Sequence, residues 1–317
     1  MALNSVTIFG GSGFLGRHLV RRLAKTGARI TIAVRNPEPA KYLRTMGDVG
    51  QITPIAVNIL DDRSVANAVE GSDAVVNLVG VLFESGRASF QAIHAEAPAR
   101  MARAAKATGA ERFVHVSAIG ADVSGPSNYA RSKAAGEAGL LSAFPTATIL
   151  RPSIVFGPED NFFNQFAALG RVLPFLPLFG GGQSKFQPVY VGDVADALMA
   201  ALTRPDVAGK TFELGGPRVY SFKELMTLTM TMTGRSKPLV SIPFGLAAIQ
   251  ASFMELLPKP LLTRDQLKQL AVDNVVAPGR LGLAALDIPA TAAEIILPTY
   301  LTRFKSGGRF AETASDT

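Results

Sequence analysis

Short apolar runs alternate with longer amphipathic stretches over the first 150 residues of the chain. The runs are rich in Val, Ile and Phe, which is typical of strands buried on both faces of a sheet. The stretches between them repeat their apolar positions every three to four residues, as helices do. This alternation predicts an α/β fold, with βαβ units around a doubly wound parallel sheet of the Rossmann-like type. The predicted strands are Ser5–Phe9, Arg29–Val34, Thr53–Val57, Ala74–Leu78, Arg112–Val116 and Thr146–Leu150, and the predicted helices are Phe14–Thr26, Asp62–Val69, Ala92–Thr108 and Tyr129–Ser142.

The regular spacing is lost after residue 157. Proline and glycine become frequent between residues 174 and 188, and the apolar segments become irregular. We therefore predict a first domain at 1–157 and a smaller C-terminal α/β lobe at 158–304, with segments that cross back onto the first domain. The polar end, residues 305–317, is predicted to be a flexible tail.

The composition indicates a globular protein with one large core or two ordinary ones. Of the 317 residues, 48% are apolar and 18% are charged, which excludes a disordered chain. The absence of cysteine excludes a disulfide framework, a thiolate metal site and a cysteine nucleophile. Only three histidines are present, His18, His94 and His115, and their wide spacing argues against zinc, so no metal is predicted.

The charge is unevenly distributed. The net charge is +7, and the first 50 residues alone hold eight basic and two acidic side chains. Such a basic region suits a phosphate-rich ligand, an anionic membrane surface or an acidic partner. No nucleic-acid-binding motif accompanies it, so nucleic acid is not a predicted partner. We also expect no secretory signal and no membrane-spanning helix, because the longest apolar segment, 239–257, is interrupted by Pro243.

Three glycines follow the first predicted strand and open the first predicted helix. Gly10, Gly13 and Gly16 allow a tight turn, a close approach of the backbone to a pyrophosphate, and close packing of the helix on the sheet. The N-terminus of the helix, with Phe14 and Leu15 in its first turn, would offer N–H groups and a partial positive charge to the phosphates. The sequence therefore predicts a dinucleotide site.

A basic residue ends the second strand, where an NAD site usually has Asp or Glu. Arg35 lies nineteen residues after Gly16. An acidic residue there would accept hydrogen bonds from the 2′-hydroxyl of the ribose, whereas a guanidinium binds a 2′-phosphate. We therefore predict that NADP(H) is preferred over NAD(H).

Tyr129 and Lys133 are spaced i and i+4, so both side chains lie on one face of a predicted helix. An ammonium close to a phenol stabilises the phenolate and lowers the pKa of the tyrosine, which favours proton transfer to or from a carbonyl group. The lysine can also hold the ribose of a nicotinamide. The pair is thus a candidate catalytic and cofactor-binding site.

With these motifs, residues 5–200 resemble the extended short-chain dehydrogenase/reductase superfamily. The resemblance implies a carbonyl-polarising hydroxyl at the end of the strand before the Tyr–Lys pair. In this chain Ala118 takes that position, and Ser117 lies one residue early. Tyr129, Lys133 and Ser117 are therefore the candidate catalytic residues, and the alanine predicts weak turnover because one hydroxyl donor is displaced.

The same resemblance implies further cofactor contacts. It places adenine contacts after the third strand and cofactor contacts at the end of the fourth, and it puts a proline-containing loop at the nicotinamide. The corresponding residues are Asn58, Ile59, Val79, Gly80, Pro152 and Ser153.

Two later stretches, 144–164 and 187–210, are similar to the NAD(P)H-binding accessory subunits of respiratory complex I and their bacterial homologues. The similarity continues through 261–266. It implies tightly held, structural NADP(H) and complex I subunits as partners. It also implies a peripheral location on the cytoplasmic face of the cell membrane, or the matrix side in a mitochondrion. Some relatives are linked to ubiquinone biosynthesis instead.

Three functions stay open at this point. The first is an accessory role in a quinone-linked respiratory complex, with little turnover. The second is an active NADP-dependent oxidoreductase or epimerase, acting on a quinone precursor, a nucleotide sugar or another carbonyl compound. The third is a nucleotide sensor.

The apolar segment Phe244–Leu257 is predicted to be a helix that is either packed in the smaller lobe or in contact with a membrane or partner.

Overall fold

The computed structural model describes residues 3–258 and 260–308, so the predicted tail lies outside the described residues from residue 309 on. The chain forms two compact units, each assembled from separate segments. The first unit comprises residues 1–152, 192–214 and 279–288, and the second comprises 153–191, 215–278 and 289–317. The chain thus leaves the first unit at Pro152 and re-enters it twice.

A parallel sheet forms the centre of the first unit. In the described part of the chain it has seven strands, in the order β11-β6-β5-β4-β1-β2-β3. This arrangement confirms the predicted Rossmann-like fold, and the order reverses between β1 and β4, the place where such sheets bind ligands. The strands are β1 (Ser5–Phe9), β2 (Arg29–Val34), β3 (Ile52–Ala56), β4 (Ala74–Asn77), β5 (Arg112–Val116), β6 (Thr148–Pro152) and β11 (Thr211–Leu214).

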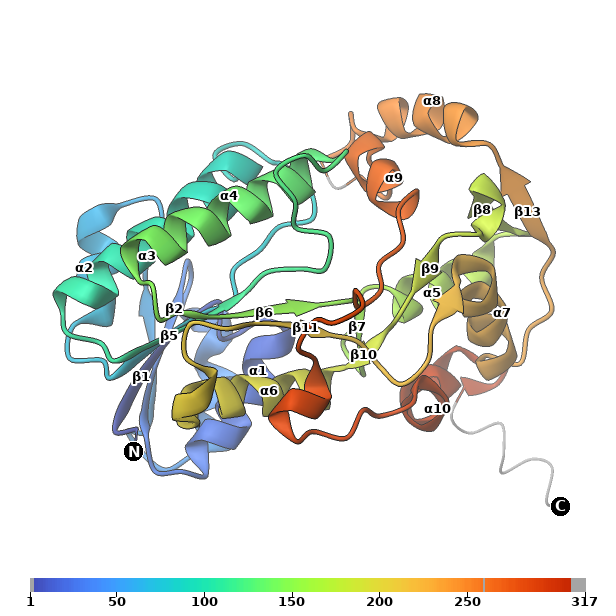
Figure 1. The fold of residues 1–317 in the computed structure, drawn as a ribbon. Coiled ribbons are helices and arrows are strands. Elements are labelled where there is room, and N and C mark those ends of the chain that lie inside the picture. The colour runs from blue at the N-terminus through green and yellow to red at the C-terminus, as the bar shows by residue number, and fades with distance from the viewer. Residues whose placement is uncertain (1–2, 259, 309–317) are drawn as a thin grey trace, which may run out of the picture. The chain divides into compact units, whose positions relative to one another are not determined.

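Helices cover both faces of this sheet. Figure 1 shows α2, α3 and α4 on one face and α1 and α6 on the other. Side-chain caps fix two of the starts, because Asp61 accepts from the Ser64 amide at 2.7 Å and Ser127 accepts from the Ala130 amide at 3.0 Å. The helices are α1 (Phe14–Ala24), α2 (Asp62–Val69), α3 (Ala97–Ala107), α4 (Asn128–Ala143) and α6 (Val191–Thr203), with 3₁₀ segments at Glu38–Met46, Pro205–Val207 and Leu283–Leu286.

One predicted helix differs from the prediction in the type of its first turns. The helix predicted over Ala92–Thr108 is present, but its first turns are π-helical: the segment Gln91–Glu96 leads directly into α3. In that segment the amide of Ala97 donates to the carbonyl of Ala92, five residues back. Apolar spacing alone does not distinguish a π turn from an α turn.

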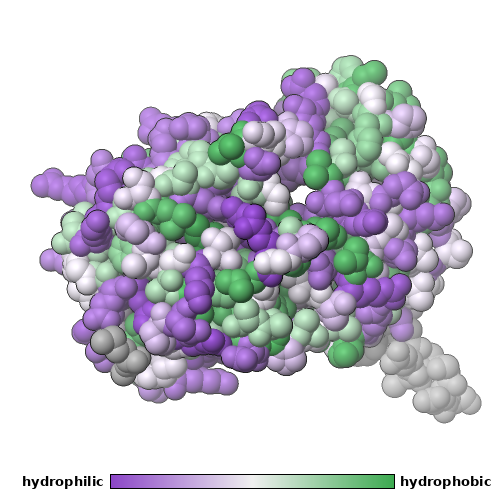
Figure 2. Space-filling view, viewed as in Figure 1, coloured by the Kyte–Doolittle hydropathy of each residue, from purple (hydrophilic) through white to green (hydrophobic). Residues whose placement is uncertain are grey.

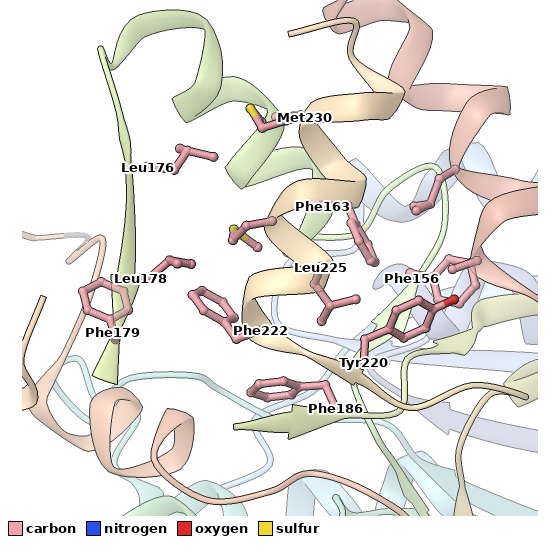
Figure 3. Close-up of a cluster of buried hydrophobic side chains, with 14 of the residues drawn as sticks. Phe156, Phe163, Leu176, Leu178, Phe179, Phe186, Tyr220, Phe222, Leu225 and Met230 are labelled. Atoms are coloured by element: carbon pink, nitrogen blue, oxygen red, sulfur yellow. The ribbon is translucent and has the colours of Figure 1, made fainter. Parts of the chain in front are cut away.

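Short parallel and antiparallel strand pairs and several helices surround an aromatic core in the second unit. Figure 3 shows Phe222 of α7 in this core with Phe179 and Phe186. The strands are β7 (Val155–Phe156), β8 (Leu176–Phe179), β9 (Lys185–Phe186), β10 (Val189–Tyr190), β12 (Tyr220–Ser221) and β13 (Leu239–Ile242). The helices are α5 (Phe163–Val172), α7 (Phe222–Met232), α8 (Phe244–Met254), α9 (Arg264–Leu270) and α10 (Ala293–Leu301), with 3₁₀ segments at Gly180–Gly182 and Thr302–Phe304.

The predicted helix at Phe244–Leu257 corresponds to α8, which has one packed side and one exposed side. Ala247 and Ala251 are buried, whereas Leu246, Ile249 and Phe253 are exposed. Figure 2 shows hydrophobic surface over this helix. Within the described residues, no helix has the length and apolarity that crossing a membrane would require.

Candidate functional site

The glycine loop joins β1 to α1. Gly10 has a φ of +79°, a conformation that favours glycine, and its amide donates to the carbonyl of Ala33 on β2 at 3.1 Å. A Cβ at Gly16 would lie 2.3 Å from the carbonyl oxygen of Gly11, so only glycine lets α1 pack this closely on the loop. Because Gly13 precedes α1 and has no side chain to cap it, the first turn with Phe14 and Leu15 can offer its N–H groups to an anion.

An open hollow lies at the carboxyl ends of β2 and β3. It has a volume of about 380 Å³ and is lined by Arg35, Ala56, Val57 and Asn58. Arg35 is exposed at its edge and contributes the only charge among these four residues. The structure thus brings together Arg35 and Asn58, two of the predicted cofactor residues. Ile59 follows them, and its carbonyl accepts a hydrogen bond from Arg100 at 3.1 Å.

The end of β4 lies at the switch point of the sheet. The amide of Val79 donates to the side chain of Asn77 at 3.0 Å, which fixes the chain as it leaves the strand. A Cβ built on Gly10 would lie 3.3 Å from the Val79 side chain. A Cβ built on Gly80 would lie 3.6 Å from Nζ of Lys133. The loop after β4 therefore lies between the glycine loop and the Tyr–Lys pair.

Lys133 is buried on α4 with 4% of its surface exposed. Its Nζ donates to the carbonyl of Val116 on β5 at 3.2 Å and lies 6.0 Å from the centre of the Tyr129 ring. Burial lowers the pKa of Lys133 to about 8, and the charge of Glu137, one turn further along α4, opposes that shift. The lysine is therefore held rigidly, with its donor group aimed at the end of β5.

Tyr129 lies one turn before Lys133, as predicted, but its acidity is opposite to the expectation. Burial raises the pKa of Tyr129 to about 12, so the expected lowering of its pKa by the lysine is not found. The cause is desolvation, which disfavours the charged phenolate. Near neutral pH, Tyr129 is a neutral phenol that can donate a hydrogen bond.

The end of β5 carries the other candidate catalytic residue. Ser117 is buried, and its amide donates to the carbonyl of Leu150 at 2.8 Å. Among the described residues, its Oγ and Nε2 of His115 have no hydrogen-bond partner. Ala118 follows and is half-buried. Two buried polar atoms without partners are costly and mark a place where a ligand or water oxygen would be stabilised.

The last two predicted cofactor residues fall in different units. Pro152 ends β6 in the first unit, whereas Ser153 begins the second, where its hydroxyl donates to the side chain of Asn274 at 2.6 Å. The predicted residues Gly10, Val79, Gly80, Tyr129 and Lys133 therefore lie close together within the first unit, and Arg35 and Asn58 lie together at its hollow.

Sequence reasoning missed two features of this site. The first is His94, whose Nε2 would lie 3.7 Å from a Cβ on Gly80. The second is a buried ion-pair network, in which Arg151 donates to both carboxylate oxygens of Glu137 at 2.9 and 2.5 Å and lies 3.6 Å from Glu213. In the sequence, the only sign of either feature is a polar residue within a run of apolar residues.

Within residues 3–258 and 260–308, no three acidic or histidine side chains gather as metal ligands would.

Comparisons with known proteins show the family to which the chain belongs. The model of the NAD dependent epimerase/dehydratase family matches residues 6–215. The mitochondrial NADH dehydrogenase (ubiquinone) 1 alpha subcomplex subunit 9 of Arabidopsis thaliana is 36% identical over 98% of this chain and 80% of its own. The Mus musculus subunit of the same name is 35% identical over 95% and 80%.

A solved structure has the same fold. An NADPH-dependent quinone oxidoreductase of Escherichia coli, complexed with NADPH, superposes with a TM-score of 0.74 over 94% of this chain and 99% of its own, at 20% identity. The resemblance inferred from the motifs is confirmed. The chain belongs to the NAD dependent epimerase/dehydratase family and, within it, to the group that contains the alpha subcomplex subunits 9 of mitochondrial NADH dehydrogenase.

Proposed function

We propose that this protein is an accessory subunit of a respiratory NADH:ubiquinone oxidoreductase, complex I, in which it binds NADP(H) mainly as a structural cofactor. The observation that carries the proposal is identity of 36% over 98% of the chain to a subunit of that complex. Similarity over both units, rather than over the nucleotide-binding part alone, favours a shared role. The protein then acts from the cytoplasmic face of the membrane, or from the matrix side in a mitochondrion.

The residues of the first unit fit a nicotinamide dinucleotide. The glycine loop and the start of α1 would hold the pyrophosphate, and the hollow with Arg35 and Asn58 would hold the adenosine end. Lys133 and Tyr129 would donate to the nicotinamide ribose. When bound, the cofactor supplies a hydride, but Ala118 leaves this chain without one of the usual donors that stabilise a developing oxyanion. Binding is therefore favoured over turnover.

Co-purification tests the assembly role most directly. A tagged chain, expressed at its native level, is purified from membranes solubilised in a mild detergent, and the polypeptides and nucleotides that accompany it are identified by mass spectrometry. We expect complex I subunits and NADP(H) in stoichiometric amounts. Recovery of the chain alone, from membranes in which intact complex I is captured through another subunit, would overturn the proposal.

Arg35 supports the preference for NADP(H) over NAD(H). Its guanidinium ends β2 at the edge of the hollow, where it can pair with a 2′-phosphate. We expect at least tenfold tighter binding of NADPH than of NADH, a difference of about 1.4 kcal/mol, in isothermal titration calorimetry. Arg35→Asp should abolish or invert the preference. Arg29→Asp is the matched control, because Arg29 is exposed at the other end of the same strand.

The enzyme alternative has its own support, since Tyr129 and Lys133 lie together on α4. It predicts rapid oxidation of NADPH by a small carbonyl compound or quinone, and loss of that activity in Tyr129→Phe. The accessory role predicts that bound NADPH stays reduced for many minutes under the same conditions. Absorbance at 340 nm distinguishes the two.

A further inference from the structure

His94 owes its position to the π-helical segment Gln91–Glu96. The hydrogen bond from Ala97 to Ala92 adds one residue to the turn, and π turns of this kind are frequent at functional sites. The extra residue leaves His94 buried with 1% of its surface exposed, in the first unit. The segment packs tightly on α4, because a Cβ at Gly136 would lie 1.8 Å from the carbonyl oxygen of His94.

The hydrogen bonds of His94 fix its tautomer. Nε2 accepts from the amide of Val81 at 3.0 Å, so it carries no proton. The proton is then on Nδ1, which lies 3.1 Å from the hydroxyl of Ser132 and can donate to it. The Ser132 hydroxyl donates in turn to the carbonyl of Tyr129 at 2.8 Å. A chain of three hydrogen bonds thus connects the loop after β4 with the start of α4.

The ring of His94 also makes aromatic contacts. It stacks on Phe90 with centroids 5.2 Å apart and an angle of 19°, and it meets Tyr129 edge to face at 5.2 Å and 86°. The imidazole therefore contacts the same tyrosine through its ring and through Ser132. Burial and the nearby charge of Lys133 lower the pKa of His94 to about 3, so the ring stays neutral and Nε2 stays available as an acceptor.

We propose that His94 is a positioning residue of the nucleotide site: its neutral imidazole holds the Gly80–Val81 loop and the Tyr129 ring in the geometry that binds the nicotinamide end of NADP(H). The proposal rests on the proposed function, because it concerns the same cofactor. Gly80 lies beside both Lys133 and His94, so movement of the loop would alter the space next to the lysine. His94 itself donates nothing to the cofactor.

Two substitutions separate the hydrogen bonds from the packing. His94→Phe keeps an aromatic ring in contact with Phe90 and Tyr129 but cannot accept from Val81. His94→Gln offers an amide oxygen near the position of Nε2 and keeps that hydrogen bond. We expect His94→Phe to weaken NADPH binding at least tenfold by calorimetry, and His94→Gln to stay within threefold of wild type.

A third variant controls for loss of stability. Thr7→Val removes two buried hydrogen bonds, to the carbonyl of Ala68 at 2.9 Å and to the hydroxyl of Ser72 at 2.7 Å, at a place remote from His94 in sequence. It should lower the melting temperature of the nucleotide-free protein and leave NADPH affinity within threefold of wild type. If His94→Phe does not fold, Ser132→Ala tests the same chain of hydrogen bonds from its other end and should weaken binding at least threefold.

Hydrogen exchange of the Val81 amide makes the test independent of nucleotide binding. In the nucleotide-free protein, exchange at Val81 should be at least tenfold faster in His94→Phe than in wild type, and close to wild type in His94→Gln. Unchanged exchange at Val81, or wild-type NADPH affinity in His94→Phe, overturns the inference. Failure of the wild-type protein to bind NADPH overturns the proposed function instead, and the exchange data then still decide whether His94 holds the loop.

Discussion

The two compact units bury different kinds of side chain. The first unit buries titratable groups on and around α4: Lys133 and Glu137 on α4 itself, His94 on the π-helical segment and His115 on β5. The second unit buries aromatic rings, and Phe222 alone meets four other phenylalanine rings at centroid distances between 5.6 and 6.4 Å. One buried carboxylate, Asp160, is present there and accepts a hydrogen bond from Tyr300.

This difference indicates that the two units have different functions. Burying charged and polar groups costs stability unless they are paired, and the groups of this layer have such partners: Arg151 pairs with Glu137, and Nζ of Lys133 donates to the carbonyl of Val116. The aromatic core of the second unit needs no ligand to be stable. That unit instead exposes apolar side chains on and after α8, namely Leu246, Ile249, Phe253, Leu256 and Leu257. Such a surface is typical of a partner contact.

Removing the cation of the buried network should have the largest effect. Arg151→Met leaves the carboxylates of Glu137 and Glu213 buried without their shared partner, which should lower the free energy of unfolding by about 3 to 5 kcal/mol. Chemical denaturation measures the change. Glu38→Gln breaks the exposed pair with Lys41 and should cost under about 1 kcal/mol. Equal losses of unfolding free energy in Arg151→Met and Glu38→Gln would show that the buried network stabilises the fold no more than an exposed ion pair does.

Truncating a ring in the aromatic core of the second unit should lower the free energy of unfolding almost as much. Phe222 is 2% exposed, and Phe222→Ala should cost about 3 to 5 kcal/mol through lost burial and the cavity that it leaves. NADPH affinity of the folded variant should stay within threefold, because Phe222 belongs to the unit without the glycine loop. A loss of NADPH affinity comparable to that of His94→Phe would show that nucleotide binding also depends on the core of the second unit.

Acid should destabilise the first unit through its buried histidines. The pKa of His94 is about 3 in the folded protein against 6.5 when unfolded, so the unfolded chain takes up the proton first. The contribution of the neutral His94 to the free energy of unfolding is therefore fully present above pH 6.5. It is lost as the pH falls towards 3, at about 1.4 kcal/mol per pH unit.

His115 adds to this slope, because burial and the charges of Lys133 and His94 lower its pKa too. In His94→Phe, the slope of unfolding free energy between pH 6 and 4 should be shallower by about 1.4 kcal/mol per pH unit. Denaturation at several pH values measures it. Thr7→Val should keep the wild-type slope, and the same slope in His94→Phe would contradict the neutral buried imidazole.

A second phenylalanine should behave in the opposite way to Phe222. Phe253 of α8 is 70% exposed, so Phe253→Ser should change the stability of the isolated protein by no more than about 0.5 kcal/mol. Co-purification with respiratory subunits should nevertheless decrease, because the exposed apolar side chain is lost from the contact. Undiminished co-purification of this variant would argue that α8 does not meet the partner.

Local patterns in the sequence were sufficient for the nucleotide-binding part of the fold. The strands at Ser5–Phe9, Arg29–Val34 and Arg112–Val116 and the helix at Asp62–Val69 have the predicted bounds. They were predictable because the apolar spacing of a strand or helix reflects the face that it buries. The strand predicted at Thr146–Leu150 is found at Thr148–Pro152, because pairing with β5 and β11 sets where it begins and ends.

The α/β fold, the glycine loop, Arg35 and the Tyr–Lys pair were therefore predictable, since each depends on residues close together along the chain. Which distant residues share the site depends instead on how the whole chain folds. His94 meets Val81 and Ser132 because a π turn and the packing on α4 aim it inward. The return of the chain as β11 brings Glu213 to Arg151, and burial among these groups, rather than spacing, sets the acidity of Tyr129 and Lys133.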